Sequence, residues 1–419
     1  MSAATSCLTE EEVRQRFAWA LRQGNPGWLW PDTSPEQWQG ALHEIEAAVR
    51  QVLREGRADE PLRGDAEDIG IAAYTSGLGP LLGYWISQGV LNAQCAAAAL
   101  LVLHYEQNAA RMEKLAEQAS RAVARLAAGG VKVTILKGMH TAFTCFPTPG
   151  TRPLSDIDLI IDAADKAVAE QVLPELGYRP EPETKMPDER VWRHFGSPKA
   201  PQSLSLVHRD DPWAIDLHTS ANRRYAVGAP IIRFDDLIGL TAPDRWSPCR
   251  DGYVLPPAAA ALFLACHAGC GVGGLRMLRL AELVLSVRQS QERNGLFWDE
   301  VVELGQATGT LPAAYAAFQL TEALAPGTIP ERVLLLCRDD TPDAVLRLIR
   351  RLTPATAHSV ARCSMEERYM WTTSLMGKIK QMLYDLVPVG RSFRTASRFY
   401  KVRFLRIVRG GLSLRSSTS

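Results

Sequence analysis

The sequence lacks the features of a secreted or membrane-spanning chain. Its first residues, MSAATSCLTEEEVRQRF, have neither the basic start nor the apolar run of a signal peptide. The longest apolar runs, such as 96–103 and 254–266, are shorter than the roughly 18 residues that a membrane helix needs. The eight cysteines lack the spacing of a disulfide framework, which predicts reduced thiols. We therefore expect a cytoplasmic protein without a transmembrane segment.

The chain also has little net charge. Its 47 Lys and Arg against 46 Asp and Glu give +1, which argues against a nucleic-acid-binding field along the whole chain. The charge is uneven, because twelve Lys or Arg and three acids lie between Arg362 and Arg415; this segment carries +9 and leaves −8 for the remainder. A length of 419 residues with 46% hydrophobic and 22% charged composition indicates a globular protein of two or three domains.

The hydrophobic period changes twice along the chain. Residues 1–128 have helical spacing, residues 129–235 contain β-rich runs and one amphipathic helix, and residues 236–419 return to helical spacing and end in a basic tail. These three regions are the predicted domains, and together they predict an α+β fold with a small mixed sheet between helical N- and C-terminal regions. The helices predicted in the first region are 10–23, 34–54, 67–88 and 92–127. The predicted strands are 131–136, 156–161, 203–208 and 212–218.

Two acids lie on one face of the predicted strand DIDLII. Side chains alternate along a strand, so Asp156 and Asp158 project from one side and Ile157, Leu159 and Ile161 from the other. Like charges at this spacing repel, and strand interiors usually avoid Asp, so a cation between the two carboxylates would explain them. Mg²⁺ fits, because it prefers a few carboxylate oxygens together with substrate phosphates. The alternative is a half-exposed strand whose polar face meets water.

A third acid repeats this pattern in the strand PWAIDLH. Asp216 lies there on the side opposite to Trp213, Ile215 and Leu217. Three carboxylates from two strands are what metal-assisted phosphoryl chemistry requires. Two of them ligate the ions that hold a triphosphate, and the third shares the ion nearest the attacking oxygen. The shared strand faces predict that the three side chains converge.

The motifs resemble a known family. LKGMHTAF, then R-x-x-x-D-x-D-L, an I-D-L-H strand about 60 residues later and the helix FLACHAGCGVGGLRMLRLAELVL are similar to the uncharacterised bacterial nucleotidyltransferase family, a branch of the DNA polymerase β-like nucleotidyltransferase superfamily. The resemblance covers roughly 129–290. It implies a small α/β palm that binds Mg²⁺ and a nucleoside triphosphate, and that transfers a nucleoside monophosphate to a hydroxyl.

The resemblance also implies roles for individual residues. Asp156 and Asp158 match the metal-binding pair and Asp216 the third acid. Lys137 and Gly138 stand where the superfamily more often has Gly-Ser; the glycine would let backbone approach phosphate and the lysine would supply charge. Arg152 is a further phosphate candidate, or it pairs structurally with an aspartate. Two nearby histidines have the same two interpretations, substrate contact or structural histidine: His140 and His218. The later helix offers Glu282 as the nearest acid.

The resulting prediction is an Mg²⁺-dependent nucleotidyltransferase. Two metal ions are expected when the triphosphate is bound, ATP is the default donor, the acceptor is an unidentified hydroxyl, and pyrophosphate leaves. Two alternatives stay open. One is γ-phosphate transfer by a kinase-type reaction on the same fold. The other is a non-catalytic adaptor that docks through its basic tail.

The basic tail itself permits more than one partner. Its cations recur mostly every three or four residues and alternate with aromatic and aliphatic side chains. Such a helix suits peripheral contact with an anionic membrane or with nucleic acid. The alternative is a C-terminal helix that packs by its apolar side and leaves its arginines in water. The cations are Arg391, Arg394, Arg398, Lys401, Arg406 and Arg409.

Overall fold

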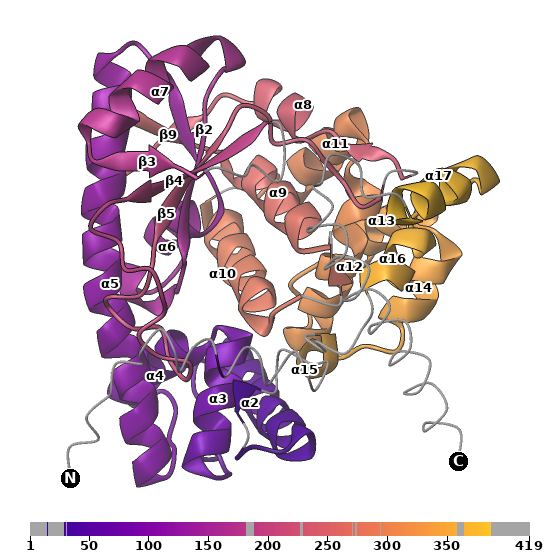
Figure 1. The fold of residues 1–419 in the computed structure, drawn as a ribbon. Coiled ribbons are helices and arrows are strands. Elements are labelled where there is room, and N and C mark those ends of the chain that lie inside the picture. The colour runs from indigo at the N-terminus through magenta and orange to yellow at the C-terminus, as the bar shows by residue number, and fades with distance from the viewer. Residues whose placement is uncertain are drawn as a thin grey trace.

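The protein combines one mixed sheet with helices on both of its faces (Figure 1). The computed structural model describes residues 15, 29–30, 32–181, 188–226, 229–269, 271–272, 275–293, 295–357 and 364–386. It confirms the α+β class and the helical regions before and after the sheet. The cations of the tail that begins at Arg391 lie outside the described residues, as does the helix predicted over 10–23 apart from residue 15.

The first helix that the structure describes in full starts at a complete capping box. In α2 (Pro35–Glu55), Ser34 Oγ accepts from the backbone N–H of Gln37, and the Ser34 N–H donates to the Gln37 side chain, at 3.1 and 3.0 Å. The long α5 (Cys95–Ala128) ends at a glycine pair, as predicted, with Gly130 at φ +83°. Capping and period together therefore identified these two helices from sequence.

The helix predicted over 67–88 is in fact two helices. These are α3 (Ala66–Ser76) and α4 (Gly79–Ser87). Gly77 adopts φ +79° and ends the first, and Pro80 lies in the first turn of the second. The prediction missed the break because apolar residues continue through it, including the fully buried Leu78.

The sheet has seven strands in the order β3-β4-β5-β2-β1-β9-β8. The pairs β2–β5 and β1–β9 are parallel and the other four pairs are antiparallel. The strands are β1 (Val133–Ile135), β2 (Asp156–Ile160), β3 (Tyr178–Pro180), β4 (Glu189–His194), β5 (Ala214–His218), β8 (Asp244–Arg245) and β9 (Gly252–Val254). A separate hairpin consists of β6 (Arg223–Arg224) and β7 (Ile231–Ile232).

The strand predicted over 203–208 is wrong. Ser203 Oγ accepts hydrogen bonds from the backbone N–H groups of Ser205 and Leu206, at 3.1 and 3.3 Å, so this segment forms a local turn in place of a strand ladder. The place beside β5 is taken by β4, whose Val191 pairs with Asp216. Several polar residues make β4 hard to recognise from its sequence.

The helices divide between the two faces of the sheet (Figure 1). Helices α5 and α7 (Lys166–Glu175) pack on the apolar face, whereas α9 (Pro257–Gly269) and α10 (Met277–Arg293) lie on the other side. The other helical elements are α6 (Lys137–Thr144), η2 (Pro149–Thr151), η3 (Ala163–Asp165), α8 (Phe234–Gly239), α11 (Phe297–Thr308), α12 (Leu311–Leu324), α13 (Glu331–Asp339), α14 (Asp343–Ile349), α15 (Pro354–Ala357), α16 (Ser364–Met370) and α17 (Leu375–Leu386).

Two apolar cores hold these layers together. One lies between α5, α7 and the sheet, and the other joins α2, α3 and α4 to α9, α10 and α12. The two ends of the chain therefore share one core, although the predicted domain boundaries at 128 and 235 stay a prediction. Within the described part of the chain, no helix combines the length and apolar character needed to cross a bilayer.

Candidate active site

Three carboxylates lie together on the sheet face that looks toward α9 and α10. Strands β2 and β5 are parallel neighbours in a register that pairs Asp158 with Asp216 and Asp156 with Ala214. One ligand atom from each acid lies within 4.8 Å of one from each of the others. The structure therefore brings together the three acids that the sequence singled out, as their shared strand faces predicted.

The apolar side of the same strands fixes this orientation. Ile157 and Leu159 of β2 and Ile215 and Leu217 of β5 are buried in the core against α5. A shift of either strand by one residue would turn these side chains out and the aspartates in, at a large cost in apolar burial. Packing of these aliphatic side chains against α5 therefore places the three carboxylates on the opposite face of the sheet.

The three acids differ in their electrostatics. Burial, followed by the charges of Asp156 and Asp158, raises the pKa of Asp216 to about 7. Burial and the charge of Asp158 also raise the pKa of Asp156. Burial acts to raise the pKa of Asp158 too, but Lys137 and His218 together hold it far below its ordinary value. Asp158 therefore stays ionised. Its negative charge disfavours ionisation of Asp156 and Asp216.

Lys137 supplies the cation next to Asp158. Its Nζ lies 2.5 Å from Asp158 Oδ1, and its side chain is 9% exposed. Among the described residues it is the one non-glycine residue with positive φ, at 50°. This backbone strain, at the point where β1 turns into α6, is of the kind that persists where surrounding contacts require it. The predicted Lys-Gly turn is therefore built around an ion pair with the central carboxylate.

Arg152 is held by Glu282, a residue 130 positions later on α10. Its Nε and Nη2 donate to the two carboxylate oxygens, at 2.9 and 3.2 Å, and its guanidinium also donates to the Pro153 carbonyl. A Cβ on residue 138 would lie 3.1 Å from three atoms of the Arg152 guanidinium. Glycine at this position therefore allows the guanidinium to lie close to the backbone. Arg152 is therefore paired with Glu282 and not with one of the aspartates, which was the structural partner predicted from the sequence.

Glu282 is the centre of a buried network that the sequence did not identify. It also accepts from Thr141 Oγ1 and, at 3.0 Å, from Arg279 Nη1. Burial acts to raise its pKa, but Arg152 and Arg279 lower it to about 2. Arg279 is 27% exposed, and its charge also acts on Asp156 and Asp158. The sequence feature that could have indicated this network is a glutamate inside the apolar run LRLAELVL.

The two histidines near the site differ. His218 is buried, with Nε2 3.3 Å from Asp158 Oδ1 and Nδ1 4.0 Å from Glu189. It therefore supports the ionised form of Asp158. Burial lowers the pKa of His140 to about 4, so its ring is neutral at physiological pH. These contacts favour a structural role for both rings.

The donor set fits a hard divalent cation. Carboxylate oxygens are the ligands that Mg²⁺ prefers, and here three of them converge on a partly exposed position. The raised pKa values of Asp156 and Asp216 show that their negative charges lack full compensation within the chain. Asp156, Asp158 and Asp216 are therefore the residues that would hold the metal.

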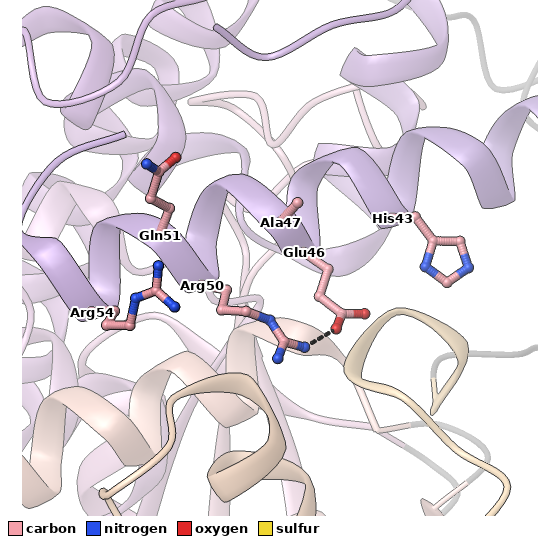
Figure 2. A pocket seen from close by; sticks show the side chains of 6 residues that line it. All are labelled: His43, Glu46, Ala47, Arg50, Gln51 and Arg54. Carbon is pink, nitrogen blue, oxygen red and sulfur yellow. Dashed lines mark hydrogen bonds and ion pairs between the residues drawn. The ribbon is translucent and has the colours of Figure 1, made fainter. Parts of the chain in front are cut away.

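A hollow elsewhere on the surface has a simpler explanation. It lies on α2 and is lined by His43, Glu46, Ala47, Arg50, Gln51 and Arg54 (Figure 2). Glu46 accepts from Arg50 Nη2 at 2.5 Å and from the backbone N–H of Ala355 at 2.8 Å. The second of these hydrogen bonds joins α2 to α15. We assign the hollow to the junction between the N- and C-terminal helices.

This site defines the class of protein. Acids on two neighbouring strands of a mixed sheet, with cations from α6 and α10, are suited to metal-assisted phosphoryl transfer. The model of a family described as uncharacterised nucleotidyltransferase matches residues 64–326. The chain belongs to this family, which supports a general nucleotidyltransferase activity. Comparison with curated proteins and with solved structures gave no match.

Removing one of the three charges is expected to stabilise the metal-free protein. For Asp216→Asn we expect the free energy of unfolding above pH 7 to increase by about 1 kcal/mol. The reason is that burial and two neighbouring acids disfavour the ionised carboxyl of the wild type. The value is reduced because the side chain is partly exposed to water. Urea unfolding with and without Mg²⁺ measures this. Mg²⁺ should stabilise the wild type more than the variant, which keeps two of the three acids. Lower stability of the variant without Mg²⁺ would contradict the assignment.

Proposed function

We propose that the protein is an Mg²⁺-dependent nucleotidyltransferase that moves a nucleoside monophosphate from a triphosphate, with ATP as the default donor, to a hydroxyl of an acceptor. The observation that carries this proposal is the convergence of three carboxylates in a chain of this family. The cysteine spacing supports a cytoplasmic location as part of the same proposal.

In this proposal the acids have separate roles. Asp156 and Asp158 on β2 hold the metal-bound triphosphate. Asp216, which pairs directly with Asp158 across the two strands, orients the acceptor hydroxyl and helps remove its proton. Bound Mg²⁺ would supply neutralisation of phosphate charge and a lower pKa for the acceptor hydroxyl. The bond from the acceptor oxygen to the α-phosphorus forms, the bond to the bridging oxygen breaks, and pyrophosphate leaves.

The cations around the acids are the proposed phosphate contacts. Gly138 lets the triphosphate approach the backbone. Lys137 would be released from Asp158 when that carboxylate binds a cation, and its ammonium would then be free for phosphate. Arg152 was predicted to bind phosphate directly, and its pairing with Glu282 makes a supporting position more consistent with the contacts. Arg279, partly exposed and electrostatically close to Asp156 and Asp158, is an additional candidate.

The position of a label tests the proposal. The protein is incubated with Mg²⁺, a panel of hydroxyl acceptors, and ATP labelled on either the α- or the γ-phosphate. We expect the α-label to move to an acceptor with release of pyrophosphate. Transfer of the γ-label would establish kinase chemistry. Magnesium-dependent binding of ATP without transfer to any acceptor would support the alternative of a non-catalytic adaptor that docks through its basic tail.

A further inference from the structure

Helix α17 exposes most of its large apolar side chains. Eleven large hydrophobic residues are exposed in the described part of the chain, and six of them lie on this one helix of twelve residues. It lies at the edge of the molecule farthest from the sheet (Figure 1). The six, with their exposed fractions, are Leu375 76%, Met376 61%, Ile379 38%, Met382 46%, Leu383 51% and Tyr384 53%.

The helix packs on the protein through its less apolar side. Gly377 and Gln381, one turn apart, are buried, and α16 is the neighbouring element. With about 100° per residue, the five aliphatic side chains fall within an arc of roughly 120° on the opposite side. Lys378 and Lys380 are exposed and flank this arc, one at each edge. An apolar stripe bordered by lysines therefore faces away from the fold.

The sequence after α17 continues the same combination of charge and apolar residues. Residues 387–419 contain eight Lys or Arg and no Asp or Glu. Three phenylalanines and a tyrosine are interleaved with these cations: Phe393, Phe399, Tyr400 and Phe404. The exposed stripe is thus joined directly to 33 residues of strong positive charge, and the expected binding surface is negative.

We propose that α17 lies flat on an anionic lipid surface, with its apolar stripe inserted among the acyl chains and its lysines at the level of the headgroups. Stable peripheral binding needs both apolar burial and charge, and α17 supplies the first while residues 378–415 supply the second. Nucleic acid is a weaker match, because the stripe consists of aliphatic side chains that offer neither donors nor stacking surfaces. Docking of α17 on a second copy of this chain is disfavoured, because two cationic surfaces would meet. This proposal does not depend on the enzymatic activity.

Sedimentation of the full chain with vesicles tests this inference. Phosphatidylcholine vesicles with and without phosphatidylglycerol are compared, at low and high salt. The test variant is Leu375→Gln/Ile379→Gln/Leu383→Gln. The matched control is Leu240→Gln/Leu296→Gln/Leu335→Gln, which changes exposed apolar residues elsewhere. All six positions are exposed, so both variants should unfold at the wild-type temperature.

We expect wild type and control to bind only the anionic vesicles, and to bind more weakly at high salt. The partition coefficient of the α17 variant should fall by about a hundredfold, since three inserted side chains become polar. Equal binding by both variants would show that the tail charge acts alone and would overturn the insertion. A wild-type dimer that the α17 variant dissociates, without vesicle binding, would assign the stripe to a second copy. Binding to RNA or DNA in place of vesicles would likewise overturn the proposal.

Discussion

Asp158→Asn is expected to weaken magnesium-dependent binding of ATP about a hundredfold and to lower nucleotidyl transfer by about a thousandfold or more. Asp158 is the acid whose ionised form the site supports most strongly, through Lys137 at 2.5 Å and His218 at 3.3 Å. Asparagine keeps the size and one oxygen but removes the charge. Titration calorimetry with a non-hydrolysable ATP analogue, with and without Mg²⁺, measures the binding without knowledge of the acceptor.

The matched control is Asp162→Asn. Asp162 follows β2 by two residues and its side chain accepts from the backbone of Ala164, a cap that asparagine also provides. This variant should bind Mg²⁺ and ATP like the wild type. If Asp158→Asn also bound ATP with the same dependence on Mg²⁺, the carboxylate face would be a structural feature and the proposed metal site would be wrong.

Glu282→Gln is expected to cost about 3 kcal/mol or more in the free energy of unfolding. The substitution leaves the buried Arg152 guanidinium without its counter-charge, and removing one partner of a buried pair costs far more than breaking an exposed one. The control is Glu175→Gln, whose partner Arg125 lies at 2.6 Å but in an exposed pair, and which should cost less than about 1 kcal/mol. Urea unfolding of the three proteins gives the comparison.

The difference in the free energy of unfolding between wild type and Glu282→Gln should decrease at acidic pH. The pKa of Glu282 is lowered from 4.5 to about 2 in the folded protein, mainly by two arginines that outweigh burial. Its charge therefore stabilises the fold above pH 4.5, and this contribution is lost as the pH falls toward 2. The gap between wild type and Glu282→Gln should be constant from pH 7 to 5 and narrow below that range. A gap that stays constant down to pH 3 would show that folding does not lower the pKa of Glu282.

The sequence was sufficient to predict the central strands and their acids. In β2 and β5 the aspartates alternate with buried aliphatic residues, so the period indicated both the strands and the face of each aspartate. The outer strands could not be predicted in this way, because β4 carries charged residues on both faces and the edge strand β8 has only two residues. Their pairing depends on tertiary neighbours that local pattern does not encode.

The network around Glu282 could not be located in the same way. Arg152 and Glu282 are 130 residues apart, and no local periodicity relates two such distant positions. A phosphate role for Arg152 was a reasonable expectation from its place four residues before Asp156. The structure shows that its guanidinium is occupied by a partner on α10, while Arg279 on the same helix stays partly exposed.

The N- and C-terminal helical regions share one core, and helices outside 129–235 cover the sheet. A fragment limited to 129–235 would leave behind α5, which covers the apolar face of the sheet, and β9, which pairs with β1. Removal of α2 to α4 would in turn expose the apolar sides of α9 and α10. Attempts to produce the catalytic region alone should therefore yield aggregates, and mutational work on this family is best done in the intact polypeptide.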